Sequence, residues 1–382
     1  MKKERTVLLF VLGLVLSSCG ESPVLSSSIV SSSSQTLTSS FYQNSLLLTA
    51  ADGTTSPLLG ADPDVIEGKD GYYYLYTSQQ YVVVGNRGKM LDRSPIYRSK
   101  DLVNWSYCSS VFLDQEVDLG SFAYSDVGIW APSIHYFFDT YYCYYSLGYA
   151  GENVEHCGIG LATSSTPYGP WTHHGKLFDS IDCGYPVSID PFAYQTDDGT
   201  IYLFWGSFFA INAVELSLDG IEVKDLANIK TNLITVIGGT PSSSESYEAT
   251  FIIKKDNRYI FMGSQNPFDG GLSSKYEVRS GSSASLFGPY RDSSGNDIYG
   301  HGDLLIRGDP SEGGLRGPGH HALIQDKKGA YWMFYHAYDA TVNGGNERVI
   351  CLDKILFDEH GVPTVEGGVP SQTSKEGPAV LL

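Results

Sequence analysis

The sequence contains few of the residues that typify helical bundles and nucleic-acid-binding proteins. Among 382 residues there are only 4 methionines, and 25 lysines and arginines stand against 43 aspartates and glutamates, for a formal net charge of −18. A chain this acidic repels phosphate backbones and anionic lipids, so we expect no nucleic-acid partner. Charged residues make up only 18% of the chain, which favours a neutral ligand instead.

Cysteine is scarce as well, and its spacing excludes two common kinds of stabilising site. Apart from Cys19, five cysteines remain, an odd number with no pair at two-residue spacing. This arrangement predicts neither a zinc site nor a complete disulfide framework. The five residues are Cys108, Cys143, Cys157, Cys183 and Cys351.

Long hydrophobic runs are missing, except for one of ten residues near the N-terminus. Residues 7–16 carry no polar side chain and follow a basic start at Lys2, Lys3 and Arg5. A ten-residue helix covers about half a bilayer, so the segment is typical of an export signal rather than a spanning helix. The Leu-Ser-Ser-Cys sequence ending at Cys19 resembles the processing site of bacterial lipoproteins and implies a lipid on the Cys19 sulfur. A plain secretory signal is the alternative.

A Ser-rich stretch separates this signal from the rest of the chain. Residues 20–45 contain 11 serines and 2 threonines and few groups able to build a core, which predicts a flexible tether. We therefore expect a signal over residues 1–19, a tether over 20–45 and one domain over 46–382. The exported protein would be a monomer held at the bacterial cell surface by its lipid.

The abundant residues point to β-structure. The chain has 42 glycines and 27 tyrosines, as expected for tight turns between aromatic strands. Tyrosine and tryptophan also stack on flat, hydroxyl-rich ligands without needing a charge. The composition thus predicts an all-β protein with a sugar as its partner.

One sequence pattern recurs five times at intervals of roughly 60 to 70 residues, as expected of a repeat architecture. Each copy has an apolar run, a short polar turn and an aromatic-rich run that usually ends near a serine, which predicts a β-hairpin. Blades of four strands fit this period, and radial stacking protects their edges. We predict a five-bladed β-propeller; two unrelated β-sandwiches are the alternative. The copies open at Asp62, Ala131, Asp190, Glu248 and His320.

If the first run of each copy is the innermost strand of a blade, these opening residues meet at the central axis. Asp62, Asp190 and Glu248 then place three carboxylates in a cavity rich in tyrosine and tryptophan. In glycoside hydrolysis one acid protonates the leaving oxygen and another activates water. A third negative charge raises the pKa of the acid that must be protonated. The pattern favours a glycosidase.

From about Leu47 to its C-terminus the chain resembles glycoside hydrolase family 43, and within it the arabinanases. The similarity lies in short motifs whose order and spacing match along the chain. These are Asp62-Pro63-Asp64-Val65-Ile66, Trp130-Ala131-Pro132-Ser133-Ile134, Gly158 to Ser164, Ser188-Ile189-Asp190-Pro191-Phe192, Gly206-Ser207-Phe208, Tyr247-Glu248-Ala249, Gly288-Pro289-Tyr290, Gly317 to His321 and Tyr335 to Asp339.

The resemblance implies a five-bladed, inverting enzyme and assigns a role to four residues. Asp62 matches the general base, Glu248 the general acid and Asp190 the acid that tunes and orients Glu248. His320 matches an axial histidine that lies beside a bound calcium ion or its water, so calcium is a possible cofactor. One imidazole alone makes no calcium site, because calcium prefers oxygen ligands, and a structural histidine is the alternative.

Two further residues are candidates for substrate binding. Trp130 could stack on a sugar ring or belong to the core. Arg348 could orient a substrate hydroxyl or form a surface ion pair. Some positions depart from the family pattern, since Ala61 stands where a histidine often precedes the base and Thr250 where a proline often follows Glu-Ala.

The resemblance favours cleavage of internal α-1,5 links of arabinan, found in the side chains of pectin. An exo-acting α-L-arabinofuranosidase or β-xylosidase of the same family is the second hypothesis, because sequence does not show whether the loops leave a groove or a pocket. A non-catalytic sugar-binding propeller is the third hypothesis.

Overall fold

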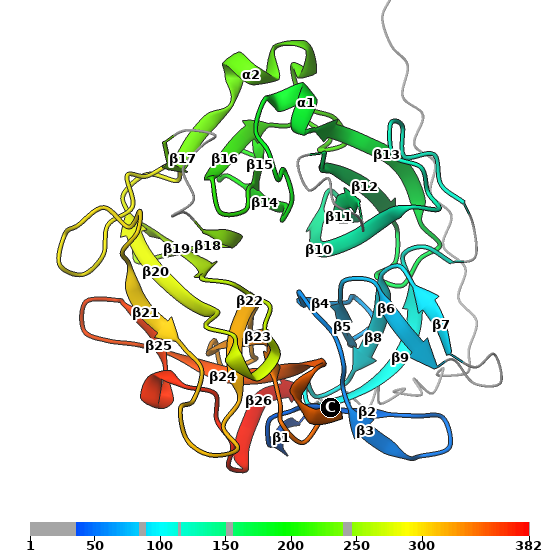
Figure 1. Ribbon diagram of the computed structural model, residues 1–382, viewed down its shortest axis with the longest axis vertical. Coiled ribbons are helices and arrows are strands. Elements are labelled where there is room, and N and C mark those ends of the chain that lie inside the picture. Colours follow the sequence, from blue (N-terminus) through cyan, green and yellow to red (C-terminus); the bar gives the residue numbers. More distant parts are fainter. Residues whose placement is uncertain (1–35, 84–88, 114–115, 150–155, 240–246, 382) are drawn as a thin grey trace, which may run out of the picture. The chain divides into compact units, whose positions relative to one another are not determined.

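The computed structural model describes residues 36–83, 89–113, 116–149, 156–239 and 247–381. Residues 36–382 form one compact unit. The signal, Cys19 and most of the expected tether lie outside the described residues. Figure 1 looks down the axis of this unit, around which five antiparallel sheets are arranged. The prediction of an all-β, five-bladed propeller is confirmed.

Each blade contains four antiparallel strands in chain order, with the first strand innermost, and in blade 1 the β6–β7 hairpin intervenes between the second and third strands. Blade 1 has β4 (Asp64–Glu67), β5 (Tyr73–Tyr76), β8 (Pro95–Ser99) and β9 (Asn104–Ser110). Blade 2 has β10 (Val127–Phe137), β11 (Thr140–Tyr149), β12 (Gly158–Ser164) and β13 (Thr172–Asp179). Blade 3 has β14 (Phe192–Gln195), β15 (Ile201–Trp205), β16 (Ala210–Glu215) and β17 (Ile234–Gly238). Blade 4 has β18 (Glu248–Lys255), β19 (Arg258–Gln265), β20 (Glu277–Ser283) and β21 (Asp303–Ile306). Blade 5 has β22 (Arg316–Gln325), β23 (Tyr331–Tyr338), β24 (Arg348–Phe357) and β25 (Pro363–Val365).

The five hairpins expected from the repeat are the two inner strands of the five blades. Their aromatic runs show no alternation with polar residues because a propeller strand is buried on both faces. In β11, Tyr141 and Tyr145 pack in a cluster with blade 1, whereas Tyr142 and Tyr144 pack in a cluster with blade 3. The hydrophobic core is thus divided among the interfaces between neighbouring blades.

Shorter elements lie outside this repeat. The hairpin of β6 (Gln80–Val83) and β7 (Lys89–Asp92) projects from blade 1. The helical segments are α1 (Ser180–Cys183), η2 (Leu226–Asn228), α2 (Ile229–Asn232), η3 (Gly271–Ser273), η4 (Asn343–Gly345) and η5 (Glu366–Gly368). Within the described ranges no helix has the length and hydropathy to cross a membrane. Cys108, Cys143, Cys183 and Cys351 are free thiols.

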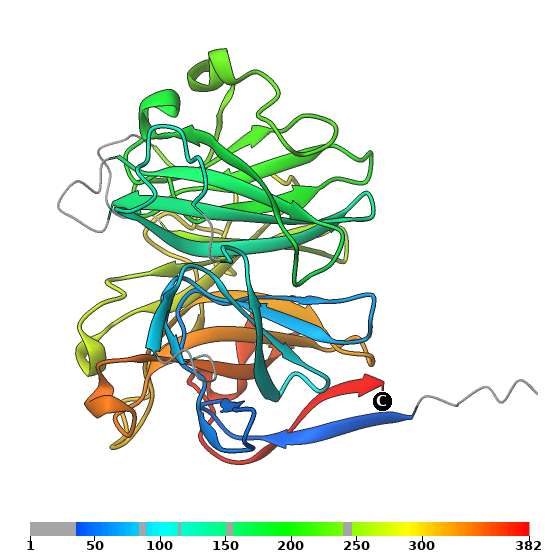
Figure 2. The ribbon, with the colours of Figure 1, turned by 90° about the vertical axis from the view of Figure 1, so that its right-hand side faces the viewer.

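The end of the expected tether is part of the fold. The sequence predicts a tether up to residue 45, but β1 (Leu37–Tyr42) pairs with β26 (Lys375–Leu381), and Figure 2 shows the two lying together at the outer edge. Next, β2 (Leu47–Thr49) and β3 (Thr55–Pro57) extend the sheet of blade 1. Serine-rich sequence can take this place because strand pairing uses backbone groups, and Tyr42 supplies a buried anchor.

The start of the folded chain joins blade 5 to blade 1. The Leu46 N–H donates to the Ile350 carbonyl over 2.9 Å, and the Ile350 N–H donates to the Leu58 carbonyl over 2.9 Å. Behind them the buried Asp353 carboxylate accepts hydrogen bonds from the Tyr42 and Tyr335 hydroxyls. The same carboxylate accepts from the Asn44 amide and the Ser371 N–H.

Replacing Asp353 by alanine would leave several buried donors without an acceptor. We expect Asp353→Ala to lower the free energy of unfolding by about 3 kcal/mol, because hydrogen bonds to a buried carboxylate are lost together. Urea denaturation followed by tyrosine and tryptophan fluorescence measures this change. Glu359→Ala, at an exposed turn, is the control, and an equal effect of both variants would contradict the role of Asp353.

Candidate active site

Five residues at equivalent places in the five blades carry an unusual backbone conformation. Each lies two residues before the inner strand or at a break in the register of that strand. Each has a positive φ without being glycine, a conformation that costs about 1–2 kcal/mol. They are Asp62 (φ 54°), Ala131 (φ 43°), Asp190 (φ 59°), Ala249 (φ 55°) and His320 (φ 44°). We call these five residues the axial ring.

A side chain of the preceding blade holds the backbone N–H of every member of the axial ring. In three cases the acceptor is a serine hydroxyl at or just beyond the end of the second strand. These bonds run from Ala131 to Ser78 (2.8 Å), from Asp190 to Ser146 (2.9 Å) and from His320 to Ser264 (2.9 Å). The other two run from Asp62 to His336 Nδ1 (3.2 Å) and from Ala249 to Asp190 Oδ2 (3.2 Å). The ring is therefore closed, and blade 5 holds blade 1.

The position of Glu248 differs from the sequence prediction. Glu248 was expected to be equivalent to Asp62 and Asp190, but Ala249 occupies that place, one residue later. Glu248 instead pairs with Ser264 as Trp130 pairs with Ser146, and a break in register follows each of them. The local bulge lets the blade contribute its carboxylate from the residue before the axial ring.

Asp62 lies among cationic and polar groups that favour its ionised form. Its Oδ1 is 3.3 Å from His320 Nδ1, 3.4 Å from His336 Nδ1 and 3.5 Å from an Arg348 nitrogen. The Ser78 hydroxyl donates to the other oxygen, Oδ2. Burial alone would raise the pKa of Asp62, but His320, Arg348 and His336 together hold it well below its usual value. Asp62 is ionised at neutral pH, as a base must be.

Glu248 has the opposite proton affinity. Its side chain is buried, with 4% of the residue exposed. The Ser207 hydroxyl donates to Oε2 over 2.7 Å, and the Tyr276 hydroxyl donates to Oε1. Burial, with a contribution from the negative charge of Asp62, raises the pKa of Glu248 to about 7 in spite of these hydrogen bonds. Glu248 can therefore hold a proton for transfer.

Asp190 resembles Glu248 in its raised proton affinity. It is 5% exposed, and burial together with the charges of Glu248 and Asp62 raises its pKa well above the usual value. Its Oδ2 also accepts the Ala249 N–H. Asp190 thus responds to the charge of Glu248 and fixes the backbone directly after that residue. The three predicted acids do come together.

His320 bridges two of these carboxylates. Its Nδ1 lies 3.3 Å from Asp62 Oδ1 and 3.9 Å from Asp190 Oδ2, and burial lowers the pKa of the imidazole. A neutral imidazole with its proton on Nδ1 can donate to Asp62.

The surroundings of His320 do not fit a calcium site made by protein side chains. Calcium takes six to eight oxygen ligands, whereas no group of three or more His, Cys, Asp or Glu side chains in the described residues could hold a metal ion. The carboxylates nearest His320 are already engaged with its ring and with hydrogen-bond donors. The role of His320 beside a calcium ion stays a prediction.

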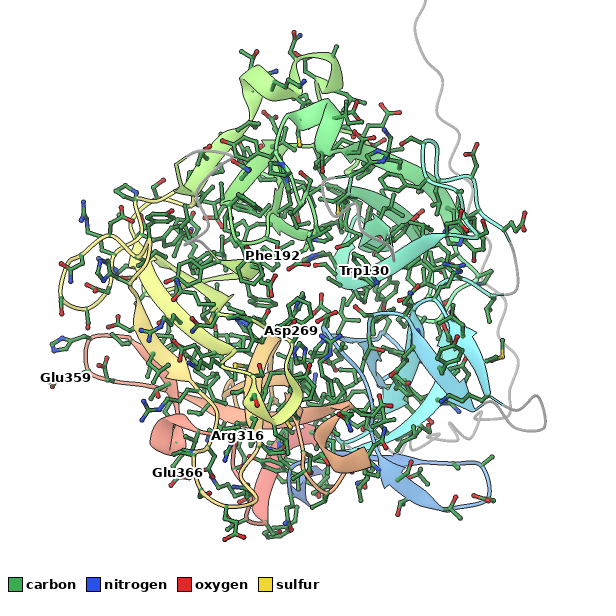
Figure 3. All side chains as sticks on the ribbon, in the orientation of Figure 1. Trp130, Phe192, Asp269, Arg316, Glu359 and Glu366 are labelled. Atoms are coloured by element: carbon green, nitrogen blue, oxygen red, sulfur yellow. The ribbon has the colours of Figure 1, made fainter. Side chains whose placement is uncertain are left out.

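The Trp130 ring packs against two glycines. Gly128 and Gly148 are opposite each other on β10 and β11, and a Cβ atom on either one would overlap the Trp130 ring. One face of the indole therefore lies flat against the glycine pair, while the side chain stays partly exposed near the axis (Figure 3). This is the arrangement that a stacking platform requires, and not that of a fully buried core residue.

Arg348 does form an ion pair, but within the site. Its guanidinium lies 3.5 Å from Asp62 Oδ1 and 5.6 Å from the centre of the Phe268 ring, with 28% of its side chain exposed. The nitrogens that do not face Asp62 can reach a ligand at the mouth of the site.

Sequence reasoning missed four residues that contact the acids. Ser78, Ser207 and His336 each lie at or just beyond the end of a second strand, and the recurring serine at that place was a usable signal for the first two. Tyr276 lies between η3 and β20, outside the repeated pattern, and gave no signal.

The arrangement combines an ionised carboxylate, a carboxyl that can be protonated and a third acid near both. Such a pair can give a proton to one atom while taking a proton from another, which is the chemistry of acid–base hydrolysis. Below these groups, an axial cavity is lined by Asp64, Ser133, Thr250 and His321.

Known proteins resemble the chain along most of its length. A model of the family described as glycosyl hydrolases family 43 matches residues 54–363. Extracellular endo-α-(1→5)-L-arabinanase 1 of Bacillus subtilis (strain 168) is 27% identical over 294 residues, which are 76% of this chain and 84% of that protein. Extracellular exo-α-(1→5)-L-arabinofuranosidase ArbA of Cellvibrio japonicus (strain Ueda107) is 29% identical over 282 residues, which are 71% of this chain and 80% of that protein.

A solved structure is similar in three dimensions. The structure of Cellvibrio cellulosa α-L-arabinanase complexed with arabinohexaose has a TM-score of 0.67 at 23% identity, covering 81% of this chain and 96% of that chain. At this identity the likeness bears on the fold, and it agrees with the five blades described above.

The raised pKa of Glu248 predicts an alkaline limit to activity. Since Glu248 must be protonated to act as an acid, we expect kcat/KM on an uncharged glycoside to fall as the pH rises through about 7. The lowered pKa of Asp62 keeps that residue ionised over the same range, so the base adds no acid limb to the profile there. A pH–rate profile from pH 4 to 9 measures this dependence, and constant activity up to pH 9 would contradict it.

Proposed function

The chain belongs to the glycosyl hydrolases of family 43, and we propose from that membership that it cleaves internal α-1,5-L-arabinofuranosyl links of arabinan with inversion. The observation that carries the proposal is the contrast between two buried acids at the axis. Asp62 is held ionised, whereas Glu248 has its pKa raised to about 7. This contrast is what a base and an acid in one hydrolytic step require.

The proposed step is a single displacement by water. Asp62 takes a proton from the water while the water oxygen forms a bond to the anomeric carbon. The bond from that carbon to the leaving sugar breaks, and its electron pair goes to the glycosidic oxygen, which takes the proton of Glu248. Attack from the face opposite the leaving group inverts the configuration.

The other residues support this step. Asp190 holds the backbone at Ala249, directly after Glu248, and its own pKa is raised by burial and by the charges of Glu248 and Asp62. Arg348 restrains the Asp62 carboxylate and is free to contact a sugar hydroxyl on its exposed side. The open face of Trp130 stacks on a sugar ring.

The substrate class rests on the relatives. The Bacillus and Cellvibrio proteins, at 27% and 29% identity, are both named for action on α-(1→5)-L-arabinose linkages. One is named as an endo-acting and the other as an exo-acting enzyme, so release of single arabinose units is the second candidate.

Both relatives are also named as extracellular, which supports export of this protein. We further propose that the exported protein carries a lipid on Cys19, a residue outside the described part of the chain. Attachment through that sulfur would keep the catalytic unit at the cell surface.

Product sizes from debranched linear arabinan test the reaction and its mode. We expect the protein to release a ladder of arabino-oligosaccharides, and Glu248→Ala to reduce the rate by at least about a hundredfold because the general acid is lost. Chromatography and a reducing-end assay measure both, with Glu359→Ala as the control. Arabinose as the sole product would favour the exo-acting enzyme. Release of sugar from arabinoxylan alone would mean that arabinoxylan, not arabinan, is the substrate. Binding of arabinan without any product would indicate a non-catalytic sugar-binding propeller.

The role of Trp130 is tested separately. We expect Trp130→Ala to raise KM for linear arabinan roughly tenfold, because one stacking contact is lost, with a smaller effect on kcat. Steady-state kinetics on oligosaccharides of defined length measure this. An unchanged KM would contradict the stacking role, and an unchanged KM together with a lowered melting temperature would place Trp130 in the core.

A further inference from the structure

We propose that Tyr276 is a positioning residue of the acid half of the site, which fixes the Glu248 carboxyl and decides which of its oxygens carries the proton. This inference rests on the proposed role of Glu248 as the general acid. Tyr276 belongs to no motif of the repeat and precedes β20 by one residue.

The contacts of Glu248 divide its two oxygens between two hydroxyls. Tyr276, of which 1% is exposed, donates to Oε1, and Ser207 donates to Oε2 from the other side. Both oxygens of the carboxyl are therefore held, so the side chain cannot turn without losing a hydrogen bond. A general acid needs this restraint because proton transfer depends on the distance and direction to the leaving oxygen.

The Tyr276 ring is itself fixed by its surroundings. It fits against Gly319, where an added Cβ would come within 2.1 Å of the ring. On another side it stacks on the His336 imidazole, with ring centres 5.6 Å apart and planes 13° apart. His336 accepts the N–H of Asp62, the proposed base. Tyr276 therefore contacts both the proposed acid, Glu248, and the histidine that holds the backbone of the base.

The hydroxyl of Tyr276 remains a donor over the whole working range. Burial, together with the negative charges of Glu248 and Asp190, raises the pKa of Tyr276 well above its usual value. Oε1 of Glu248 accepts the hydrogen bond from Tyr276, so the proton of the neutral carboxyl cannot lie on Oε1 and point toward Tyr276. The Ser207 hydroxyl, which donates to Oε2 of the ionised carboxylate, can turn and act as an acceptor when Glu248 is neutral. The proton of neutral Glu248 therefore resides on Oε2 and leaves from there to the glycosidic oxygen.

The two hydrogen bonds stabilise the ionised form of Glu248, which remains after proton transfer, more than the neutral form. Hydrogen bonds from Tyr276 and Ser207 stabilise the ionised form and lower the pKa of Glu248, and Arg348 acts in the same direction. Burial and Asp62 raise it, and the charge of Glu248 in turn raises the pKa of Asp190. Removing the tyrosine hydroxyl should shift this balance upward.

Tyr276→Phe removes the hydroxyl and keeps the ring that contacts Gly319 and His336. We expect the pKa of Glu248 to rise by about one unit, because a hydrogen bond to the ionised form is lost. Carbon-13 NMR of protein labelled at the glutamate carboxyl carbons reports this value without any substrate, and Glu248→Gln assigns the signal. Tyr290→Phe is the matched control, since Tyr290 is also 1% exposed but donates to the Leu286 carbonyl within a turn.

Kinetics give the second readout. We expect Tyr276→Phe to move the alkaline limb of the pH–rate profile upward with the NMR value and to lower kcat about tenfold, while Tyr290→Phe does neither. An unchanged Glu248 pKa in a folded Tyr276→Phe variant would overturn the proposal, as would an equal shift in the Tyr290→Phe control. If arabinan is not the substrate, the wild-type protein fails in the kinetic assay too, whereas the NMR comparison still decides the role of Tyr276.

Discussion

The hydrogen bond that each blade forms to the backbone of the next blade is the constraint on which the site depends. Five residues around the axis adopt a conformation that is unfavourable for side chains other than glycine. Each keeps it because a side chain of the preceding blade accepts its N–H. The energy cost of these positive φ angles is divided among five blade interfaces. Each interface offsets its share with one hydrogen bond to the strained residue. The same contacts set where Asp62 and Asp190 stand relative to each other.

Structure and chemistry share these contacts at two of the five interfaces. Between blades 3 and 4 a serine is present at the usual place, but Ser207 donates to Glu248, and Asp190 takes over the bond to Ala249. Between blades 5 and 1 the serine is replaced by His336, which both accepts the Asp62 N–H and faces its carboxylate. The departures from the repeat thus lie where the acid and the base lie, whereas the interfaces that hold Ala131, Asp190 and His320 keep the serine contact. At the first of these, Ser78 also donates to the Asp62 carboxylate.

Much of the fold could be predicted from the sequence because the blade hairpins are local and repeated. Turns such as Asp197-Asp198-Gly199 and aromatic runs such as Tyr141–Tyr145 are visible without knowing what they pack against. The three acids could be found for the same reason. The register of Glu248 could not, because a bulge shifts one residue and only strand pairing shows it. The predicted tether extends too far, because β1 pairs with β26 through backbone groups and a Ser-rich sequence does not reveal such pairing. Tyr276 was out of reach, since it contacts Glu248 from a loop whose path depends on the whole of blades 4 and 5.

The pairing of β1 with β26 brings the two ends of the folded unit together. Leu37 lies opposite Leu381, so the chain enters and leaves the propeller at one corner. A circular permutant could therefore join these ends by a short linker and open the chain at an exposed turn such as Asp256–Asn257, between β18 and β19. Such a permutant would begin near β19 and end at β18, so pairing between its two end strands would complete blade 4 and keep all five axial contacts. The position at which the chain starts can therefore change while the order of the blades around the axis stays the same.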